Sequence, residues 1–472
     1  GLFGTMDKVK LIPKAIKGLT PRDYEDIFID ISNREANTPM IVFLYMHGGY
    51  KEMWDKPHLQ DPALPRNIAE YMRESIDKGW TKVHPPENRT PKAYIFTGCN
   101  PLRRWPSPQI AKKVLWPKFD VVVSVNFRMS TSTMFADYVL PVAGYYEKYG
   151  IKYGQSYVPY IITSDKATEP LGEAKSDWEV FGLLSKTIAE RAKARNIPPV
   201  RGFKDRPHDL TKVYEEHTEN GKYDPTHPED PVKLMDAVFA GSPSLGARNG
   251  REALAMGAVP VIGTGGPSLI YQNYSDYDPK DTHWPHRDFV EKKVAWPTLS
   301  GRQQFYIDHP WFLEGGESLP THKPPPHAGS KYPLRIYGGH NRWSIHAIWR
   351  DVKLLLRLQR GQPVCWLNPN EAEKRGIKDG DMARLYNHHG EFECMVKVAA
   401  VAAPGEVIVY HAWEPYQFKN WKGNQEPAEA PWKALHLAGG YHHIHYRMYY
   451  GGPSHAPRGV PVEIEKVVRA AA

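Results

Sequence analysis

The chain has 472 residues, of which 24% are charged and 41% hydrophobic, and its formal net charge is +8. This balance is typical of a globular protein of about three domains, at roughly 150 residues each, and excludes a fibrous or largely disordered chain. The positive excess is small for this length. It permits an anionic ligand but does not indicate a nucleic-acid-binding protein.

Apolar runs and cysteines exclude further classes. No apolar run reaches the roughly 18 residues of a membrane-spanning helix, and the runs 40–46 and 121–125 have the length of strands. The three cysteines, Cys99, Cys365 and Cys394, lie far apart and form no CxxC pair. A disulfide framework, a zinc finger and a self-contained iron–sulfur site are therefore disfavoured.

Residues 1–200 are predicted to form an α/β region that binds a dinucleotide. A buried strand is expected over 93–97, a basic helix over 108–115, a second strand over 119–125 and a third over 138–140. A helix is also expected over 177–195. Strands that are apolar on both faces and alternate with helices predict a doubly wound parallel sheet.

The rest of the chain divides into two regions of different composition. Residues 201–330 are rich in proline, histidine and aspartate, and we expect an insertion followed by an extended linker. Residues 331–472 are predicted to form a small β-barrel, because short β-rich runs follow one another closely with turn signals between them. These runs are 364–367, 382–386, 393–401, 406–410 and 460–464.

Polar residues follow the first two predicted strands, at the point where each strand ends. Ligands of open α/β sheets collect at the carboxyl ends of strands, where glycine lets a phosphate approach and hydroxyls and amides bind phosphate or ribose. An ordinary strand-to-helix turn, and capping of a helix by the hydroxyl run, are the alternatives. The candidate binding residues are Gly98, Asn100, Pro101, Asn126, Ser130 and Ser132.

A segment of the predicted barrel region, 338–346, is dense in hydrogen-bonding and aromatic side chains. It contains His340, Arg342, Trp343 and His346. Such a segment suits binding of a polar heterocycle that carries anionic groups, with a surface loop around a half-buried tryptophan as the alternative.

A second histidine-rich segment, 439–445, lies near the C-terminus. It places Tyr441, His443 and His445 on one face of a strand. One strand cannot by itself supply the geometry of a metal site, so hydrogen-bonding histidines are favoured and no metal ligand is predicted.

One segment indicates a different activity. Residues 251–262, followed by the glycine-rich 263–266, resemble the sugar-nucleotide half of retaining glycosyltransferases. The likeness covers fewer than twenty residues, and a helix followed by a strand often has this pattern. Glycosyltransfer is therefore kept as the remote alternative.

From about residue 92 to the end, the motifs resemble the C-terminal half of a molybdenum oxidoreductase of the dimethyl sulfoxide reductase family. Several motifs in the family's order are more specific than any one alone. They are the turn 98–101, the segments 126–132, 136–141, 147–148, 172–178 and 300–306, and in the barrel region 368–369, 375–377, 379–381, Ala372, Asn387 and Gly390.

Three further segments are similar to the nitrate reductase-like branch of this family. They are 340–346, 411–414, and 439–441 with 449–451. This branch includes oxyanion reductases, dimethyl sulfide dehydrogenase and the hydrocarbon-hydroxylating ethylbenzene and steroid C25 dehydrogenases. The aromatic content of 12% favours the hydrocarbon hydroxylases.

The resemblance implies a cofactor and a set of binding residues. It implies a bis(molybdopterin guanine dinucleotide) molybdenum cofactor, with one dinucleotide held by Gly98, Asn100 and Pro101 and with Asn126, Ser130 and Ser132 beside them. From the barrel, Arg342, Trp343 and His346 are expected to face the pterins, with His340 near them, and Tyr441 and His443 are weaker candidates. The resemblance places no catalytic residue and no metal ligand in this portion.

The resemblance also implies partners that the sequence does not contain. Family members carry a [4Fe–4S] motif and the molybdenum ligand, and neither can be located here. We therefore expect the C-terminal portion of a larger catalytic subunit, which works with its own N-terminal portion, an iron–sulfur β subunit and a haem b γ subunit. The resemblance also implies a small-molecule substrate and export to the periplasm.

Overall fold

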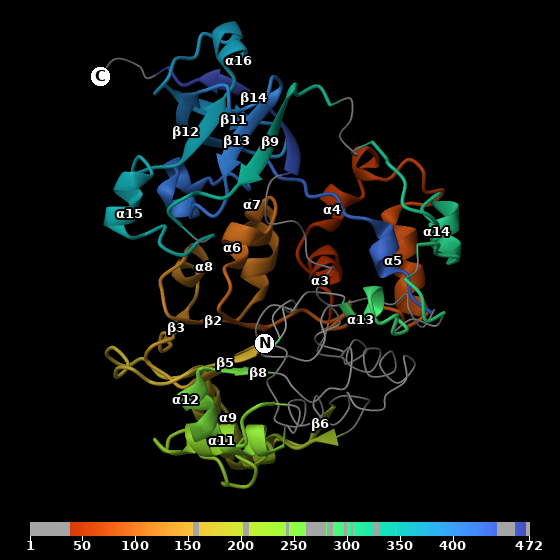
Figure 1. Cartoon of the computed structure of the whole chain (residues 1–472). Helices are drawn as coiled ribbons and strands as arrows, with labels where there is room; N and C mark the ends of the chain where they lie inside the picture. Colours follow the sequence, from red (N-terminus) through yellow and green to blue (C-terminus); the bar gives the residue numbers. More distant parts are fainter. Residues whose placement is uncertain are drawn as a thin grey trace. The chain divides into compact units, whose positions relative to one another are not determined.

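The computed structural model describes residues 38–153, 160–201, 207–241, 245–260, 280, 287–296, 300–303, 305–324, 330–344, 346–440 and 458–468 (Figure 1). The chain separates into two compact units that interleave in sequence. One is built on Leu140–Gln304, and the other combines Glu35–Val139 with Phe305–Ala472. The predicted domain boundaries after residues 200 and 330 stay predictions.

Short helices open the second unit: α3 (Met40–Met46), α4 (Lys51–Trp54), the 3-10 turn η1 (Pro57–Leu59) and α5 (Ile68–Asp77). The run 40–46 has the length of a strand but forms a helix, because a short run that is apolar throughout has no period that distinguishes the two. Asn67 and Glu70 close a capping box at the start of α5.

The predicted parallel sheet is present. Strand β1 (Ala93–Thr97) pairs in parallel with β2 (Val121–Asn126), and β3 (Tyr138–Pro141) follows in the order β1-β2-β3. Between β1 and β2 the chain forms α6 (Pro101–Arg104), α7 (Pro108–Ile110), the π-helical turn η2 (Ala111–Leu115) and the 3-10 turn η3 (Trp116–Lys118). After β2 comes α8 (Thr131–Met134).

Strand β1 was predicted to be buried, and this is wrong for most of its length. Phe96 is buried, but Ile95 is 51% exposed. Exposed and more buried residues alternate along β1, so one face of this strand is not covered by the described part of the chain. The hydrophobic core of this part of the unit contains Leu102, Trp105 and Leu115, which come from the helical segment between β1 and β2.

A closed six-stranded barrel completes the second unit, as predicted (Figure 1). Its order is β10-β12-β11-β14-β9-β13, and alternate residues such as Leu334, Ile336 and Val407 fill its interior. The strand β9 (Leu334–Gly339) was not among the predicted runs. The others are β10 (Val364–Leu367), β11 (Met382–Tyr386), β12 (Glu391–Val398), β13 (Glu406–Tyr410) and β14 (Arg458–Lys466).

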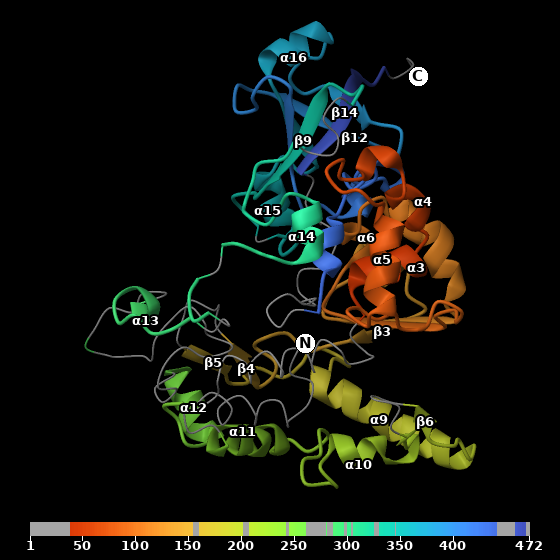
Figure 2. The ribbon, with the colours of Figure 1, turned by 90° about the vertical axis from the view of Figure 1, so that its right-hand side faces the viewer.

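Short helices lie beside the barrel and in the segments that join it to the sheet (Figure 2). They are α14 (Pro310–Glu314), α15 (Lys353–Leu358), α16 (Pro369–Lys374), η6 (Pro415–Gln417), η7 (Lys419–Trp421) and η8 (Ala434–Leu437). Trp311 and Leu435 enter the same hydrophobic core as α3 and α5. The helices α14 and η8 therefore pack with the N-terminal helices of this unit, whereas the barrel interior forms a hydrophobic core of its own.

The first unit contains an antiparallel sheet, β4 (Gly150–Tyr153), β5 (Tyr160–Ser164) and β8 (Ala258–Pro260). The predicted helix over 177–195 is α9 (Asp177–Ala194), which Ser176 caps. The glycosyltransferase-like segment forms α12 (Gly250–Met256) and then β8, and residues 263–266 lie outside the described ranges. The remaining elements are β6 (Val200–Arg201), β7 (Pro207–His208), η5 (Leu210–Lys212), α10 (Val213–His217), α11 (Asp230–Ala240) and α13 (Arg287–Val290).

Within the residues described, every helix is too short or too polar to cross a bilayer.

Candidate cofactor-binding site

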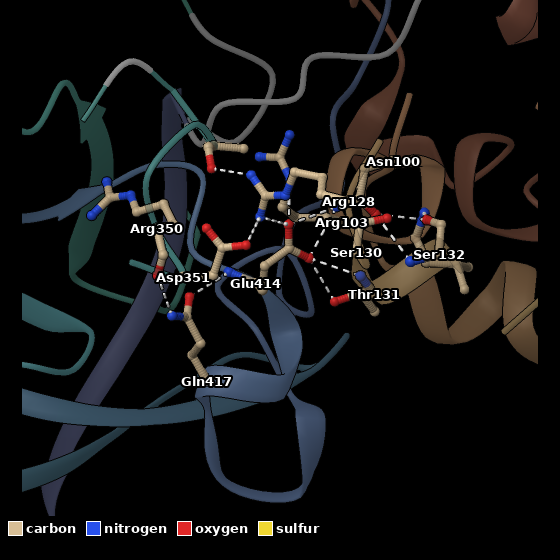
Figure 3. Close-up of polar contacts among 12 residues, drawn as sticks. Asn100, Arg103, Arg128, Ser130, Thr131, Ser132, Arg350, Asp351, Glu414 and Gln417 are labelled. Carbon is tan, nitrogen blue, oxygen red and sulfur yellow. Dashed lines mark hydrogen bonds and ion pairs between the residues drawn. The ribbon is translucent and has the colours of Figure 1, made fainter. Parts of the chain in front are cut away.

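A fully buried carboxylate, Glu414, joins the barrel to the carboxyl ends of β1 and β2 (Figure 3). It lies between β13 and η6. Asn100 Nδ2 donates to both of its oxygens, at 2.8 and 2.9 Å. The backbone N–H and the hydroxyl of Thr131, at the start of α8, donate to Oε2 at 3.0 and 2.7 Å. These bonds hold the two loops and the barrel segment in one arrangement.

The amide of Asn100 is satisfied by protein groups on both of its atoms. Its Oδ1 accepts from the backbone N–H of Ser132 at 3.2 Å and from the Ser132 hydroxyl at 2.7 Å. Ser132 Oγ in turn accepts from the backbone N–H of Leu102 at 2.8 Å. Asn100 and Ser132 are therefore positioning residues here, and their contact with a dinucleotide stays a prediction.

Two partly buried arginines, Arg103 and Arg128, lie near Glu414, and the buried Arg350 lies near Arg103. Arg103 Nε lies 3.9 Å and Arg128 Nη2 lies 3.6 Å from Glu414 Oε1, and Arg128 Nη2 is also 3.5 Å from Asp351. Arg350 donates to the His411 carbonyl at 2.8 Å. Arg103 and Arg128 follow the ends of β1 and β2, whereas Arg350 comes from the segment between β9 and α15 (Figure 3).

The positive charge of this arginine cluster exceeds its negative charge. Burial, opposed by Glu414 and assisted by the neighbouring arginines, lowers the pKa of Arg103 to about 10. Burial and Arg103 lower the pKa of Arg350 to about 10 as well. Arg103 and Arg128 lie near Glu414, Arg128 also lies near Asp351, and Arg350 adds a third positive charge close to Arg103. These groups carry three positive and two negative charges, an excess that one bound anion would balance.

Several buried donors of the cluster also lack acceptors. Among the described residues, Arg103 Nε, Arg350 Nε, and Nε and Nη2 of Arg128 have no hydrogen-bond partner. Buried guanidinium N–H groups require acceptors, and phosphate oxygens match the guanidinium geometry. The residues present therefore fit a phosphate-bearing cofactor.

The remaining predicted strand-end residues have different surroundings. Gly98 has a φ of +58°, and a side chain added there would meet nothing within 4 Å, so its backbone faces open space. Asn126 Oδ1 accepts from the N–H of Phe127 at 2.9 Å. The Ser130 hydroxyl accepts from Thr133 N and caps α8, so the capping alternative is confirmed at Ser130.

The predicted heterocycle-binding segment brings two of its histidines to a third, His411. His346 Nδ1 lies 2.7 Å from His411 Nε2, and His411 Nδ1 lies 2.6 Å from the Gly339 carbonyl. A carbonyl only accepts, so His411 Nδ1 carries the proton and its Nε2 accepts from His346. Burial and the two neighbouring histidines lower the pKa of His411 to about 4, which keeps this ring neutral.

The outer part of this segment is open to solvent. His340 is exposed and its ring centroid lies 4.5 Å from that of His411. The Arg342 guanidinium lies over Trp343, which is 44% exposed. Tyr441 and His443 lie outside the described residues.

Sequence reasoning missed the arginine cluster and Glu414 as site residues. Arg103 and Arg128 stand six and three positions beyond the ends of the predicted strands 93–97 and 119–125, which is a usable signal. Arg350 and Glu414 carry no such signal, because they reach the site through the barrel.

The fold and the site define a protein in which a parallel sheet and a closed barrel meet at a buried carboxylate, beside arginines that fit a phosphate-bearing group. Residues 42–187 match the molybdopterin oxidoreductase family model, and residues 334–429 match the molydopterin dinucleotide binding domain. Together these matches cover more than half of the chain. The chain belongs to the molybdopterin oxidoreductase family.

Three curated relatives are similar over most of this chain. The respiratory nitrate reductase subunit alpha of Haloferax mediterranei is 34% identical, over 92% of this chain and 44% of that protein. The perchlorate reductase subunit alpha of Dechloromonas aromatica is 30% identical, over 89% and 44%. The dimethylsulfide dehydrogenase subunit alpha of Rhodovulum sulfidophilum is 29% identical, over 84% and 42%. The chain spans less than half the length of these relatives.

Proposed function

We propose that this chain holds the bis(molybdopterin guanine dinucleotide) cofactor within the catalytic alpha subunit of a multi-subunit oxidoreductase. The observation that carries the proposal is that buried N–H groups of Arg103 and Arg128 have no hydrogen-bond acceptor among the described residues. A pyrophosphate would supply both the acceptors and the charge that this cluster lacks.

The chemistry comes from the cofactor, which supplies two-electron transfer at molybdenum when bound. The chain supplies binding and orientation. Arg103 and Arg128 neutralise phosphate charge, and Glu414 keeps the two arginines in place without saturating them. The His346–His411 pair offers fixed donors and acceptors to a heterocycle.

The substrate class that the comparisons support best is a small oxyanion, since two of the similar proteins are named as reductases of nitrate and perchlorate. Hydrocarbon hydroxylation is the second candidate and has the aromatic content of 12% in its favour. We further propose an iron–sulfur β subunit and a haem b γ subunit as partners, and a periplasmic location.

The test measures molybdenum and released guanine nucleotide per chain in the purified complex, for wild type, Arg128→Gln and the exposed control Arg357→Gln. The Arg128 variant is expected to retain at least about tenfold less cofactor, because one charge-assisted contact contributes about 1.5–3 kcal/mol. Arg357→Gln should keep the wild-type content. Equal cofactor content in all three proteins would remove the phosphate assignment.

Substrate class is separated by dye-linked assays of the same wild-type complex. An oxyanion reductase oxidises a reduced viologen with nitrate, chlorate or perchlorate. A hydroxylase instead reduces an oxidised dye with ethylbenzene or a steroid side chain.

A further inference from the structure

A second cluster of metal-binding residue types lies in the described structure and takes no part in the arginine cluster around Glu414. It consists of His58 from η1, His388 and His389 from the turn between β11 and β12, and Glu429 from the segment before η8. One ligand atom from each of the four residues lies within 4.8 Å of the others.

The three imidazoles converge on one carboxylate oxygen. Glu429 Oε1 lies 3.2 Å from His58 Nε2, 3.0 Å from His388 Nε2 and 2.7 Å from His389 Nε2. Three imidazole nitrogens and one carboxylate oxygen, all within 4.8 Å of one another, are the donor set of a four-coordinate transition-metal site.

The buried member of this group supplies independent evidence for a ligand. The side chain of His389 is 8% exposed, and its Nε2 has no hydrogen-bond partner among the residues described. The contact with Glu429 Oε1 is close but is not aligned as a hydrogen bond. A cation next to His389 Nε2 would give this nitrogen a partner, because a neutral imidazole offers a lone pair to a metal ion.

The backbone around the cluster is held in place before any ion binds. Asn387 Oδ1 accepts from the N–H groups of His389 and Gly390, at 2.8 and 3.2 Å. A side chain at Gly390 would meet the Glu426 carbonyl oxygen at 2.5 Å, so glycine allows the turn to approach the 426–429 segment. The Glu429 carbonyl accepts from Trp54 Nε1 at 3.0 Å. Such support is what orients ligands in metal sites.

We propose that His58, His388, His389 and Glu429 bind one zinc ion. Imidazole nitrogen and carboxylate oxygen are zinc ligands, whereas calcium and magnesium require sites built almost entirely of oxygen. The side chains of His58 and His388 are 45% and 37% exposed, which leaves a path for the ion from solvent. The zinc ion joins η1 to the β11–β12 turn of the barrel. The sequence did not predict it, since the ligands come from three distant segments.

The test uses the purified full complex, stripped with a chelator and then dialysed against Zn²⁺ alone, with molybdenum and iron measured in the same samples. Wild type and the exposed control His322→Gln are expected to retain one zinc per chain. His389→Gln should retain none. A wild-type protein without zinc, or one equivalent retained in His389→Gln, would overturn the proposal.

Two further variants keep the outcome decisive if His389→Gln folds poorly. His58→Gln changes a half-exposed side chain and should weaken zinc binding at least about tenfold. Unchanged zinc affinity in this variant would contradict the four-ligand set.

The His340–His346–His411 group is the rival location for the ion. Zinc that is lost in His346→Gln and kept in His58→Gln would move the ion there and overturn the assignment. Cobalt substitution should give the intense visible absorption of tetrahedral coordination in wild type and not in His389→Gln.

These readouts do not depend on molybdenum. A failed zinc test leaves the dinucleotide site as it stands, and a failed cofactor test leaves the zinc site.

Discussion

The side-chain nitrogen of Asn100 donates to both carboxylate oxygens of Glu414, at 2.8 and 2.9 Å, although 314 positions separate the two residues. Through this pair the turn after β1 is attached to the segment after β13. Because the carboxylate is completely buried, its hydrogen bonds and its two arginine neighbours must together offset the cost of removing it from water.

Replacement of Glu414 by alanine is therefore expected to destabilise the protein by about 3–5 kcal/mol, since it removes the carboxylate nearest to Arg103 and leaves Arg128 with Asp351 alone. Urea unfolding of the cofactor-free protein measures this loss. The matched control is Glu391→Ala, whose carboxylate is 37% exposed in its ion pairs with Arg384 and Lys422 and should cost less than about 1 kcal/mol. Equal losses in the two variants would contradict the account of Glu414.

Arg342→Ala should lower cofactor retention if this exposed side chain faces a bound pterin. The guanidinium now lies 4.9 Å from the centroid of the Trp343 ring. A contact of this kind contributes about 1–2 kcal/mol, so a roughly five- to thirtyfold loss of affinity is expected. Molybdenum content is the measurement and Arg357→Ala the control. A normal molybdenum content in Arg342→Ala would end the assignment of this residue.

Burial raises the pKa of Glu426 to about 7, so this group takes up its proton in the folded state well before it does so in the unfolded chain. Its contribution to stability is full below pH 4.5 and is lost as the pH rises through 7. Glu426→Gln removes the charge at similar size. We expect it to stabilise the protein by about 2 kcal/mol at pH 8 and to change little at pH 4.5. A gain that is independent of pH would show a cause other than ionisation.

The pKa of His411 is lowered by burial, so its contribution to stability depends on pH in the opposite direction to that of Glu426. Its pKa of about 4 in the folded protein lies below the ordinary histidine value, so the unfolded chain binds the proton first as the pH falls. Stability from this group is complete above pH 6.5 and declines toward pH 4, by about 1–2 kcal/mol after allowance for solvent screening. Thermal unfolding across this range should show a shallower slope for His411→Asn. An unchanged slope would mean that His411 is not buried as a neutral ring.

The sequence by itself determined the α/β and β-barrel fold classes and the positions of several strands. Short apolar and β-rich runs bounded by turn residues predict four strand positions that the structure reproduces to the residue, β1, β10, β11 and β13, because these depend on neighbours along the chain. The strand end also pointed to Asn100, which contacts Glu414, whereas a role for Gly98 stays a prediction. Where the local pattern carries no period, as in 40–46, the sequence does not distinguish a strand from a helix; this segment forms a helix that shares a hydrophobic core with Trp311 and Leu435.

Only the tertiary structure decided which charges share a buried space. Arg103 and Arg128 meet Glu414 because the barrel brings it to the sheet edge, and His58 meets His389 because η1 lies against the β11–β12 turn. Burial turns these ordinary surface residue types into groups that need a counter-charge or a ligand. That need arises from the loss of water around them, which no single stretch of sequence encodes.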